Sequence, residues 1–262
     1  MITTLAILQA RMSSTRLPGK VMKPILGRPM IERQIERLRC CKRVDQLIVA
    51  TSTHPEDDVL EALCSGLGVP CFRGDLEDVL DRFYRAAKPY TPKHVVRLTG
   101  DCPLTDPRLI DELIDFYLEA RCDYANNCEE PTLPDGLDAE VFSFAALTRA
   151  WQEAVLPSQR EHVTSFIRSH PERFKIGIYK YQRDLSDLRW TVDEPEDLQF
   201  AAKVYEKLYP ADAAFRMEDI LALLEREPEL MEINRRFERN SGLKKSIEKD
   251  KRFLSDKREI KT

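Results

Sequence analysis

The sequence lacks the long apolar run that a membrane-spanning helix needs, and it has no N-terminal segment typical of a signal peptide. We therefore expect a cytoplasmic chain that does not enter a membrane. The seven cysteines are an odd number without a CxxC pair, which predicts reduced, structural thiols. The net charge of −4 does not favour a general nucleic-acid-binding protein. No internal repeat is visible, so the 262 residues fit one large domain or one domain with an appendage.

Two common phosphate-binding signatures, the Walker A motif and the G-x-G-x-x-G fingerprint, are also missing. In their place, an apolar run at 5–8 leads into the loop QARMSSTRLPGK at 9–20, which carries Arg11, Arg16 and Lys20. Three cations beside free backbone N–H groups suit a polyphosphate ligand. The alternative is a basic loop that is simply solvated.

The first half of the chain alternates between buried apolar runs and segments of helical periodicity. This β-α-β-α-β-α pattern predicts an α/β fold with a mostly parallel sheet and helices on both faces. Ligands of such sheets bind beyond the carboxyl ends of the strands, where loop 11–20 and Asp101 are expected. Strands are predicted at 4–10, 45–52, 68–75, 94–103, 139–143, 174–181 and from 189, with a polar loop at 126–138. Helices are predicted at 29–41, 55–66, 144–155, 158–169 (capped by Ser158 with Glu161) and 195–208, and after the caps Asp75 and Asp106.

Two aspartates follow predicted strands at the same edge of the sheet. Asp101 comes after the sequence VVRLTG, and Asp193 comes after WTV. Paired carboxylates at such an edge suit Mg²⁺, which takes few protein ligands and completes its shell with water and phosphate oxygens. Ordinary helix or turn caps are the alternative for both residues.

A third group of polar residues suits a hydroxylated, anionic acceptor. Carboxylates accept hydrogen bonds from vicinal hydroxyls, and arginines bind carboxylates or phosphates. The polar turn and surface roles that such residues often have remain the alternative. The candidates are Asn126, Asp135, Asp138, Glu140, Arg160, His162 and Arg189.

The loop at 9–20 resembles the signature loop of the sugar-acid cytidylyltransferases, which include the 3-deoxy-manno-octulosonate and acylneuraminate enzymes. Further segments resemble the spore-coat polysaccharide (SpsF-type) branch of that family, in the same order along the chain. They are ATSTHPEDD, FRGDLEDVLDRF, VVRLTGDCPLTDP, DYANN, PDGLDAEVFS, SQREHVT and LRWTVDEPEDL. The resemblance covers roughly residues 2–208, and the acceptor-side motifs are those of the SpsF-type branch, so the acceptor does not carry over.

The resemblance implies a single Rossmann-like nucleotide-diphospho-sugar transferase domain at 1–210, with an acceptor and dimerisation excursion at 126–181 and a helical extension at 211–262. It implies a homodimer that joins CMP from CTP to an anionic sugar-like acceptor with Mg²⁺ and releases pyrophosphate. Arg11, Lys20 and Asp101 match the catalytic positions, and Asp101 and Asp193 match the metal ligands. The implied nucleotide-binding residues are Leu8, Ala10, Arg11, Ser14, Arg16, Lys20, Ser52, Arg73 and Asp101.

Two other functions remain open at this point. One is a glycosyltransferase on a similar scaffold, although no D-x-D motif follows a buried strand and three loop cations suit a triphosphate better than a diphosphate. The other is a non-catalytic nucleotide-binding subunit, which the presence of Arg11, Lys20, Asp101 and Asp193 disfavours.

Overall fold

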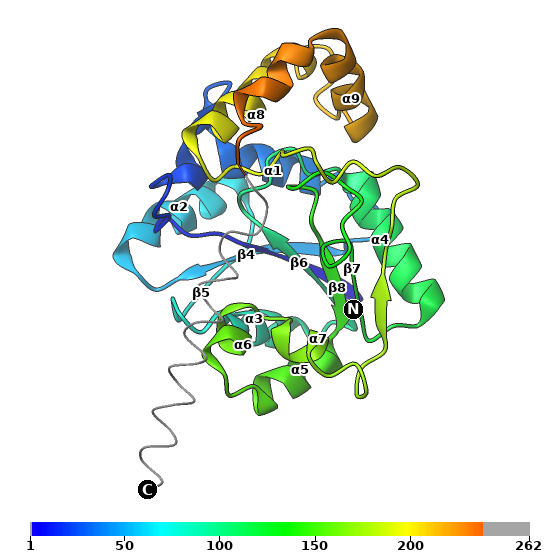
Figure 1. Cartoon of the computed structure of the whole chain (residues 1–262). Coiled ribbons are helices and arrows are strands. Elements are labelled where there is room, and N and C mark those ends of the chain that lie inside the picture. Colours follow the sequence, from blue (N-terminus) through cyan, green and yellow to red (C-terminus); the bar gives the residue numbers. More distant parts are fainter. Residues whose placement is uncertain (1, 238–262) are drawn as a thin grey trace, which may run out of the picture.

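A seven-stranded sheet forms the centre of the computed structural model, which describes residues 2–237 (Figure 1). The strand order is β5-β4-β1-β6-β8-β7-β9, and a separate two-stranded hairpin pairs β2 with β3. The strands are β1 (Thr4–Gln9), β2 (Pro24–Ile25), β3 (Arg28–Pro29), β4 (Gln46–Ser52), β5 (Cys71–Gly74), β6 (His94–Thr99), β7 (Tyr124–Asn126), β8 (Glu140–Ser143) and β9 (Ile176–Ile178).

Nine α-helices and four short 3-10 helices lie within the described residues. The α-helices are α1 (Met30–Leu38), α2 (Asp58–Leu67), α3 (Val79–Ala87), α4 (Pro107–Ala120), α5 (Phe144–Glu153), α6 (Pro157–Glu161), α7 (Ser165–Arg168), α8 (Pro195–Leu208) and α9 (Met217–Arg226). The 3-10 helices are η1 (Lys20–Met22), η2 (Pro55–Asp57), η3 (Lys88–Tyr90) and η4 (Pro228–Ile233).

The N-terminal half of the sheet is parallel, which confirms the predicted architecture. β1 pairs in parallel with both β4 and β6, and β4 pairs in parallel with β5. Leu5 and Ile7 of β1 pack on one face of the sheet, while Ala6 and Leu8 pack on the other. A strand that is buried on both faces reads as a continuous apolar run, as this one does. The carboxyl ends of β1, β4 and β6 therefore lie along one edge.

The C-terminal half of the sheet is mixed. β8 runs antiparallel to both β6 and β7, and β7 pairs in parallel with β9. The sequence did not reveal β7, because three residues are too few for a periodic pattern. The predicted strand at 174–181 is shorter in the structure. The strand predicted from residue 189 is wrong, since only an isolated bridge joins Arg189 to Asp135.

Helices cover both faces of the sheet, as predicted. Figure 1 shows α1, α4, α8 and α9 on one side, and α3, α5, α6 and α7 on the other. Each side has its own core of buried apolar residues, the first including Ile31 and Phe200 and the second including Phe83 and Leu147. The sheet lies between these two helical layers, and the carboxyl ends of its parallel strands lie along one edge.

Two helix predictions need correction. The segment predicted as one helix at 158–169 forms two, α6 and α7, because the chain turns at Val163, whose φ is +36°. Ser158 is not its cap, since α6 begins at Pro157 and the Gln159 Oε1 accepts a hydrogen bond from the Leu156 N–H. Asp75 does not cap α3 either, because Asp78 accepts the capping hydrogen bond from the Asp81 N–H.

The α8, α9 and η4 segments continue the chain beyond the sheet, and α9 packs with α8 in one core. No helix among the described residues is long and apolar enough to span a membrane. The part of the predicted helical extension at 211–262 that follows residue 237 lies outside the described residues.

Gly136 provides a test of how tightly the loop before β8 packs. It has a φ of +111°, and a Cβ there would lie 2.6 Å from the carbonyl carbon of Trp190 and 2.9 Å from the Thr191 Cα. Gly27 also has a positive φ, +75°, but a Cβ there would meet nothing within 4 Å. We expect Gly136→Ala to lower the free energy of unfolding by about 1–3 kcal/mol more than Gly27→Ala. Denaturant unfolding measures both free energies, and an equal loss in the two variants would contradict the close packing of Gly136 against residues 190 and 191.

Candidate functional site

Three side chains from distant parts of the sequence meet at the carboxyl edge of the parallel strands. Asp101 follows β6, Asp193 precedes α8, and Lys20 opens η1. The Lys20 Nζ lies 3.1 Å from Asp101 Oδ2, 2.8 Å from Asp193 Oδ1 and 2.9 Å from the Val192 carbonyl oxygen. The structure thus brings the two predicted metal ligands to one point.

Burial and charge act in opposite directions on these groups. Burial raises the pKa of Asp101, but the charge of Lys20 and hydrogen bonds outweigh it and hold that pKa at about 2. Burial lowers the pKa of Lys20, yet Asp101 and Asp193 together raise it above its usual value. The lysine is therefore protonated and Asp101 ionised at neutral pH.

Close backbone packing positions Asp101. The Gly100 N–H donates to the Gln9 carbonyl at 2.8 Å, so the ends of β1 and β6 are held together. A Cβ on Gly100 would lie 2.9 Å from the Ala10 Cβ, which shows why this position needs glycine. The Val192 N–H donates to the Asp101 carbonyl, also at 2.8 Å. The backbone of Asp101 is thereby fixed between β1 and the segment that carries Asp193.

A buried ion-pair network positions Asp193. Arg189 donates to both carboxylate oxygens of Asp197 at 2.9 Å and to Asp135 at 3.1 Å. Asp197 in turn accepts a hydrogen bond from the Asp193 N–H at 2.9 Å. Arg189 and Asp135, which the sequence predicts to bind the acceptor, are therefore partners of one another in this structure.

The loop at 9–20, here called the cationic loop, carries three cations that have different partners. Arg16 pairs with Asp193 at 2.7 Å, and Lys20 lies in the carboxylate cluster. Ser14 stays within the loop, where its Oγ accepts a hydrogen bond from the Leu17 N–H. Arg11 is exposed, and its charge acts on Arg82 instead.

Ser52 and Arg73, which the resemblance places beside the nucleoside, take part in protein contacts here. Ser52 is fully buried and its Oγ donates to Asp57 at 2.5 Å. Arg73 donates through its Nε to the Ser52 carbonyl and pairs with Asp58 at 2.6 Å. These contacts hold the carboxyl end of β4 in place. The two side chains therefore stabilise the backbone of this strand end.

Asp57 is a positioning residue that the sequence did not single out. Its Oδ1 accepts a hydrogen bond from the Met12 N–H at 2.7 Å, and its Oδ2 accepts from the Ser52 N–H at 3.0 Å. Burial raises the pKa of Asp57, but the Ser52 hydroxyl and the backbone N–H groups lower it below its usual value. One ionised carboxylate thus joins the cationic loop to the end of β4.

Arg82 is a second residue that the sequence did not indicate. Its side chain is 2% exposed, and no carboxylate among residues 2–237 forms an ion pair with it. Its Nη1 donates to the Asp75 carbonyl at 2.7 Å, while its Nε is buried without a hydrogen-bond partner. Burial, and next the charge of Arg11, lower its pKa to about 10. Arg82 is therefore a buried cation without a direct ion pair among the described residues, and the charge of the loop acts on it.

A cavity of about 510 Å³ adjoins the carboxylate cluster. Asp101 and Asp193 belong to its lining, so it begins where the lysine and the two carboxylates meet. Five of the predicted acceptor residues also line it, namely Asp135, Asp138, Glu140, His162 and Arg189.

The other two predicted acceptor residues are engaged elsewhere. Arg160 does not line this cavity, and it pairs with Asp78 at 2.5 Å. Asn126 is fully buried, and its Oδ1 accepts hydrogen bonds from the N–H groups of Cys128 and Glu129 at 2.8 Å. The Asn126 side chain stabilises the turn after β7, whereas Arg160 joins α6 to the residue that caps α3.

Arg97 and Arg168 are lining residues that the sequence did not indicate. Arg97 donates to Gln9 at 3.0 Å and pairs with Glu140. Glu140 also accepts hydrogen bonds from Tyr124 and Thr164, both at 2.6 Å, so its oxygens are occupied. The Nε of Arg168 is buried without a hydrogen-bond partner, and its Nη1 lies 3.8 Å from Glu129.

His162 lies in the turn between α6 and α7. Burial lowers its pKa most, and the charges of Arg97 and Arg168 lower it further. Its imidazole is therefore neutral at physiological pH, when it can both donate and accept hydrogen bonds.

At the carboxyl edge of the parallel strands, the ligands available to a metal ion are the carboxylate oxygens of Asp101 and Asp193. Within the described part of the chain, no group of three or more His, Cys, Asp and Glu side chains could hold a metal. Mg²⁺ is usually bound through one or two carboxylates and substrate phosphates. Asp101 and Asp193 already converge on one cation, the Lys20 ammonium, so their chemistry and placement fit Mg²⁺.

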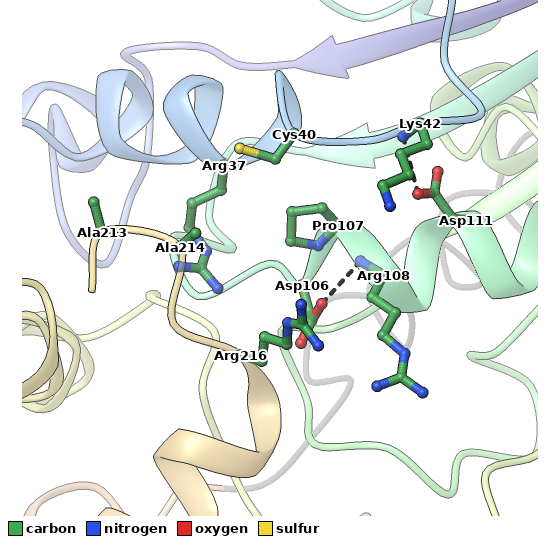
Figure 2. Close-up of a pocket in the computed structure, with 10 residues that line it drawn as sticks. All are labelled: Arg37, Cys40, Lys42, Asp106, Pro107, Arg108, Asp111, Ala213, Ala214 and Arg216. Atoms are coloured by element: carbon green, nitrogen blue, oxygen red, sulfur yellow. Dashed lines mark hydrogen bonds between the residues drawn. The ribbon is translucent and has the colours of Figure 1, made fainter. Parts of the chain in front are cut away.

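A second cavity, of about 410 Å³, lies where α1, α4 and the α8–α9 connection meet (Figure 2). None of the predicted site residues lines it. Arg37 is 3% exposed there and donates to the Thr105 carbonyl at 2.6 Å and to the Phe215 carbonyl at 2.7 Å. Asp106 accepts hydrogen bonds from the N–H groups of Arg108 and Met217. These contacts brace the connection from Asp101 to α4.

A family model described as cytidylyltransferase matches residues 5–231. The chain belongs to the cytidylyltransferase family. This cytidylyltransferase is 37% identical to an uncharacterized protein of Methanocaldococcus jannaschii, over 88% of this chain and 93% of that one. It is 34% identical to the spore coat polysaccharide biosynthesis protein SpsF of Bacillus subtilis, over 86% and 95%.

Solved structures confirm the fold of this cytidylyltransferase. A cytidylyltransferase of Leptospira borgpetersenii superposes with a TM-score of 0.83 at 32% identity, covering 88% of this chain and 97% of that one. A CMP:2-keto-3-deoxy-manno-octonic acid synthetase complexed with CTP shares the fold, with a TM-score of 0.61 at 18% identity and coverages of 78% and 99%. The predicted family and enzyme class, a nucleotidyltransferase, are confirmed, and the glycosyltransferase and non-catalytic alternatives lose their support.

Asp57→Asn tests the link between the cationic loop and β4. Because the folded-state pKa of Asp57 is lowered, its contribution to stability is present above the unfolded pKa of about 3.9 and is lost as the pH falls through the lower folded value. We expect Asp57→Asn to cost about 1.5–3 kcal/mol of unfolding free energy at pH 7. The difference from the unsubstituted protein should shrink as the pH falls below about 4.

The neighbouring Asp58 supplies the control, because it is exposed and pairs only at the surface with Arg73. Denaturant unfolding from pH 3 to 7 should show a much smaller effect for Asp58→Asn. If the two substitutions behave alike, Asp57 does not hold the loop.

Proposed function

We propose that this cytidylyltransferase transfers CMP from CTP to a hydroxyl of an anionic sugar or sugar acid, in the presence of Mg²⁺, and releases pyrophosphate. The observation that carries the proposal is the convergence of Lys20, Asp101 and Asp193 at the mouth of a cavity that also presents Arg97 and Arg168. A cationic loop and a carboxylate pair suit a triphosphate with its metal, and the arginines suit an anionic acceptor.

The nucleotide would lie along the loop after β1. Arg11 and Lys20 would bind the phosphates, because arginine offers a planar pair of donors and lysine a point charge. Arg16 and Ser14 would complete the set of loop residues that contact the nucleotide. The backbone at Leu8 and Ala10 would face the base. Ser52 and Arg73 hold the end of β4 that this base would approach.

In the reaction, the acceptor oxygen forms a bond to the α-phosphorus while the bond from that phosphorus to the pyrophosphate oxygen breaks. The hydroxyl proton passes to solvent, and the leaving pyrophosphate takes up the electron pair of the broken bond. Lys20 and Arg11 would stabilise the charge on the phosphates, and the protein forms no covalent intermediate. Asp101 and Asp193 would hold Mg²⁺, which when bound would supply positive charge at the α-phosphate and lower the pKa of the hydroxyl.

The acceptor would occupy the 510 Å³ cavity. Asp135 and Asp138, which line it, would accept hydrogen bonds from sugar hydroxyls, and neutral His162 would donate or accept one. The negative group of the acceptor would bind at Arg97 and Arg168. Glu140, with its oxygens occupied, would fix Arg97 rather than contact the sugar.

The names of the relatives suggest the pathway class. The Bacillus subtilis relative is a spore coat polysaccharide biosynthesis protein, and a Sodalis glossinidius relative, 29% identical over 69% of this chain and 74% of its own, is a 3-deoxy-manno-octulosonate cytidylyltransferase. We therefore place this enzyme in the biosynthesis of a surface polysaccharide or glycoconjugate. The homodimer and the cytoplasmic location remain predictions.

Pyrophosphate release tests the proposed reaction directly. The protein is incubated with CTP, Mg²⁺ and a panel of sugar acids that includes 3-deoxy-manno-octulosonate. We expect acceptor-dependent release that falls at least 100-fold in Asp101→Asn, because the amide cannot replace a carboxylate at the reacting phosphate. Asp115→Asn, on the surface of α4 where it pairs with Arg43, should retain activity. A fully active Asp101→Asn protein would refute the assignment.

Arg168→Gln tests the acceptor side with whichever acid the panel identifies. The loss of one charge-assisted contact should raise the KM for the acceptor by about 10-fold or more. The KM for CTP should change by less than 2-fold, since Arg168 lines the acceptor cavity. Arg149→Gln, which removes an exposed arginine paired with Glu153, is the control. An unchanged acceptor KM in Arg168→Gln would argue against this binding mode.

A further inference from the structure

The ammonium group of Lys20 uses all of its donors within the protein. A protonated lysine has three N–H groups and no acceptor. Its three partners here are Asp101 at 3.1 Å, Asp193 at 2.8 Å and the Val192 carbonyl at 2.9 Å. Only 11% of the side chain is exposed. In this arrangement Lys20 has no donor left for a phosphate.

The two carboxylates are similarly committed. Asp101 Oδ2 and Asp193 Oδ1 both face the ammonium, and Arg16 at 2.7 Å and Arg189 at 3.6 Å lie beside the second oxygen of Asp193. A divalent cation bound by both aspartates would lie where the Lys20 ammonium lies now. Two cations so close together repel strongly in a partly buried site. The ammonium and the divalent cation therefore cannot share this position.

We propose that Lys20 and a divalent cation occupy the Asp101–Asp193 pair in turn, so that the nucleotide controls entry of the metal. The inference rests on the proposed function. Without nucleotide, the lysine neutralises the carboxylates and keeps metal affinity low. When the triphosphate binds, Lys20 moves to the phosphates, and the carboxylate pair becomes available together with new phosphate oxygens. By linkage, metal and nucleotide then strengthen each other's binding.

This exchange prevents the carboxylate pair from retaining a metal ion when no substrate is present. It also means that a cation faces the carboxylate pair in both states, the ammonium in one and the metal ion in the other. The segments that carry Asp101 and Asp193 would not need to move, because the Arg189–Asp197 network and the contact of Gly100 with β1 hold them.

The decisive experiment is a Mn²⁺ titration of nucleotide-free protein, followed by the electron paramagnetic resonance signal of free Mn²⁺. We expect Lys20→Met to bind one Mn²⁺ at least tenfold more tightly than the unsubstituted protein, since the competing charge is gone. Lys23→Met is the matched control, because it removes a lysine that directly follows η1 and forms no ion pair with either aspartate. It should bind Mn²⁺ like the unsubstituted protein.

Thermal unfolding gives a second readout. Without metal, Lys20→Met removes the positive charge between the two carboxylates and leaves Asp101 without its ion-pair partner, so its Tm should fall, and Mn²⁺ should restore it by more than it raises the Tm of the unsubstituted protein. If Lys20→Met does not fold, Lys20→Gln, which keeps donors but no charge, is titrated in the same way. Equal Mn²⁺ affinity with and without Lys20 would overturn the exchange.

The proposed function fails separately. If the unsubstituted protein does not bind CTP in calorimetry with Mg²⁺ present, the nucleotide assignment is wrong, whatever the Mn²⁺ titration shows. If CTP binds but Lys20→Met gains no Mn²⁺ affinity, the function stands and the exchange is wrong.

Discussion

A single lysine ammonium held between two carboxylates organises the functional edge of this protein. Lys20 comes from the loop after the first strand, Asp101 from the end of β6, and Asp193 from the segment before α8. The partly buried carboxylate of Asp101 has Lys20 as its ion-pair partner, and a lysine as enclosed as Lys20 would lose its proton more readily without the two acids. The cluster therefore joins three distant parts of the chain at one point, and that point is where the phosphate chemistry of a cytidylyltransferase is required.

The surrounding structure supports that cluster from two sides. On one side, Asp57 ties the cationic loop to β4 and thereby sets the path of the chain from Met12 toward Lys20. On the other, Asp197 lies under Arg189 and holds the backbone of Asp193. Both supports are ionised carboxylates that accept hydrogen bonds from backbone N–H groups. The site thus depends on charge in its supporting residues as well as in the residues that would contact substrate.

The sequence allowed the sheet and the carboxylate cluster to be predicted, because both depend on where strands end. Apolar runs locate β1, β4 and β6, and parallel pairing then brings Lys20 and Asp101 to one edge. The segment before α8 was harder to predict, because it brings Asp193 to that edge without forming a strand. Side-chain directions could not be predicted, because they depend on packing between elements. Arg160 therefore pairs with Asp78 away from the cavity, whereas Arg97, inside an apolar strand, faces it.

Arg82 is a second example of a side chain whose direction could not be predicted from the sequence. Its place at helical spacing in α3 suggests an ordinary exposed arginine, and only the fold shows it buried without a carboxylate partner among the described residues. The charge of Arg11 lowers the pKa of Arg82, so two like charges act on each other near the cationic loop. Positive charge gathered near a loop in this way favours the binding of a polyanion.

Thermal unfolding with each of CTP, UTP, GTP, ATP and dTTP, with and without Mg²⁺, tests the central claim most directly. A ligand present at 100 times its dissociation constant stabilises the folded state by about 2.7 kcal/mol, which is a readily measured shift. The account predicts the largest stabilisation with CTP, increased further by Mg²⁺. The absence of a shift with any triphosphate, or an equal shift with all five, would contradict a cytidylyltransferase site built on Lys20, Asp101 and Asp193.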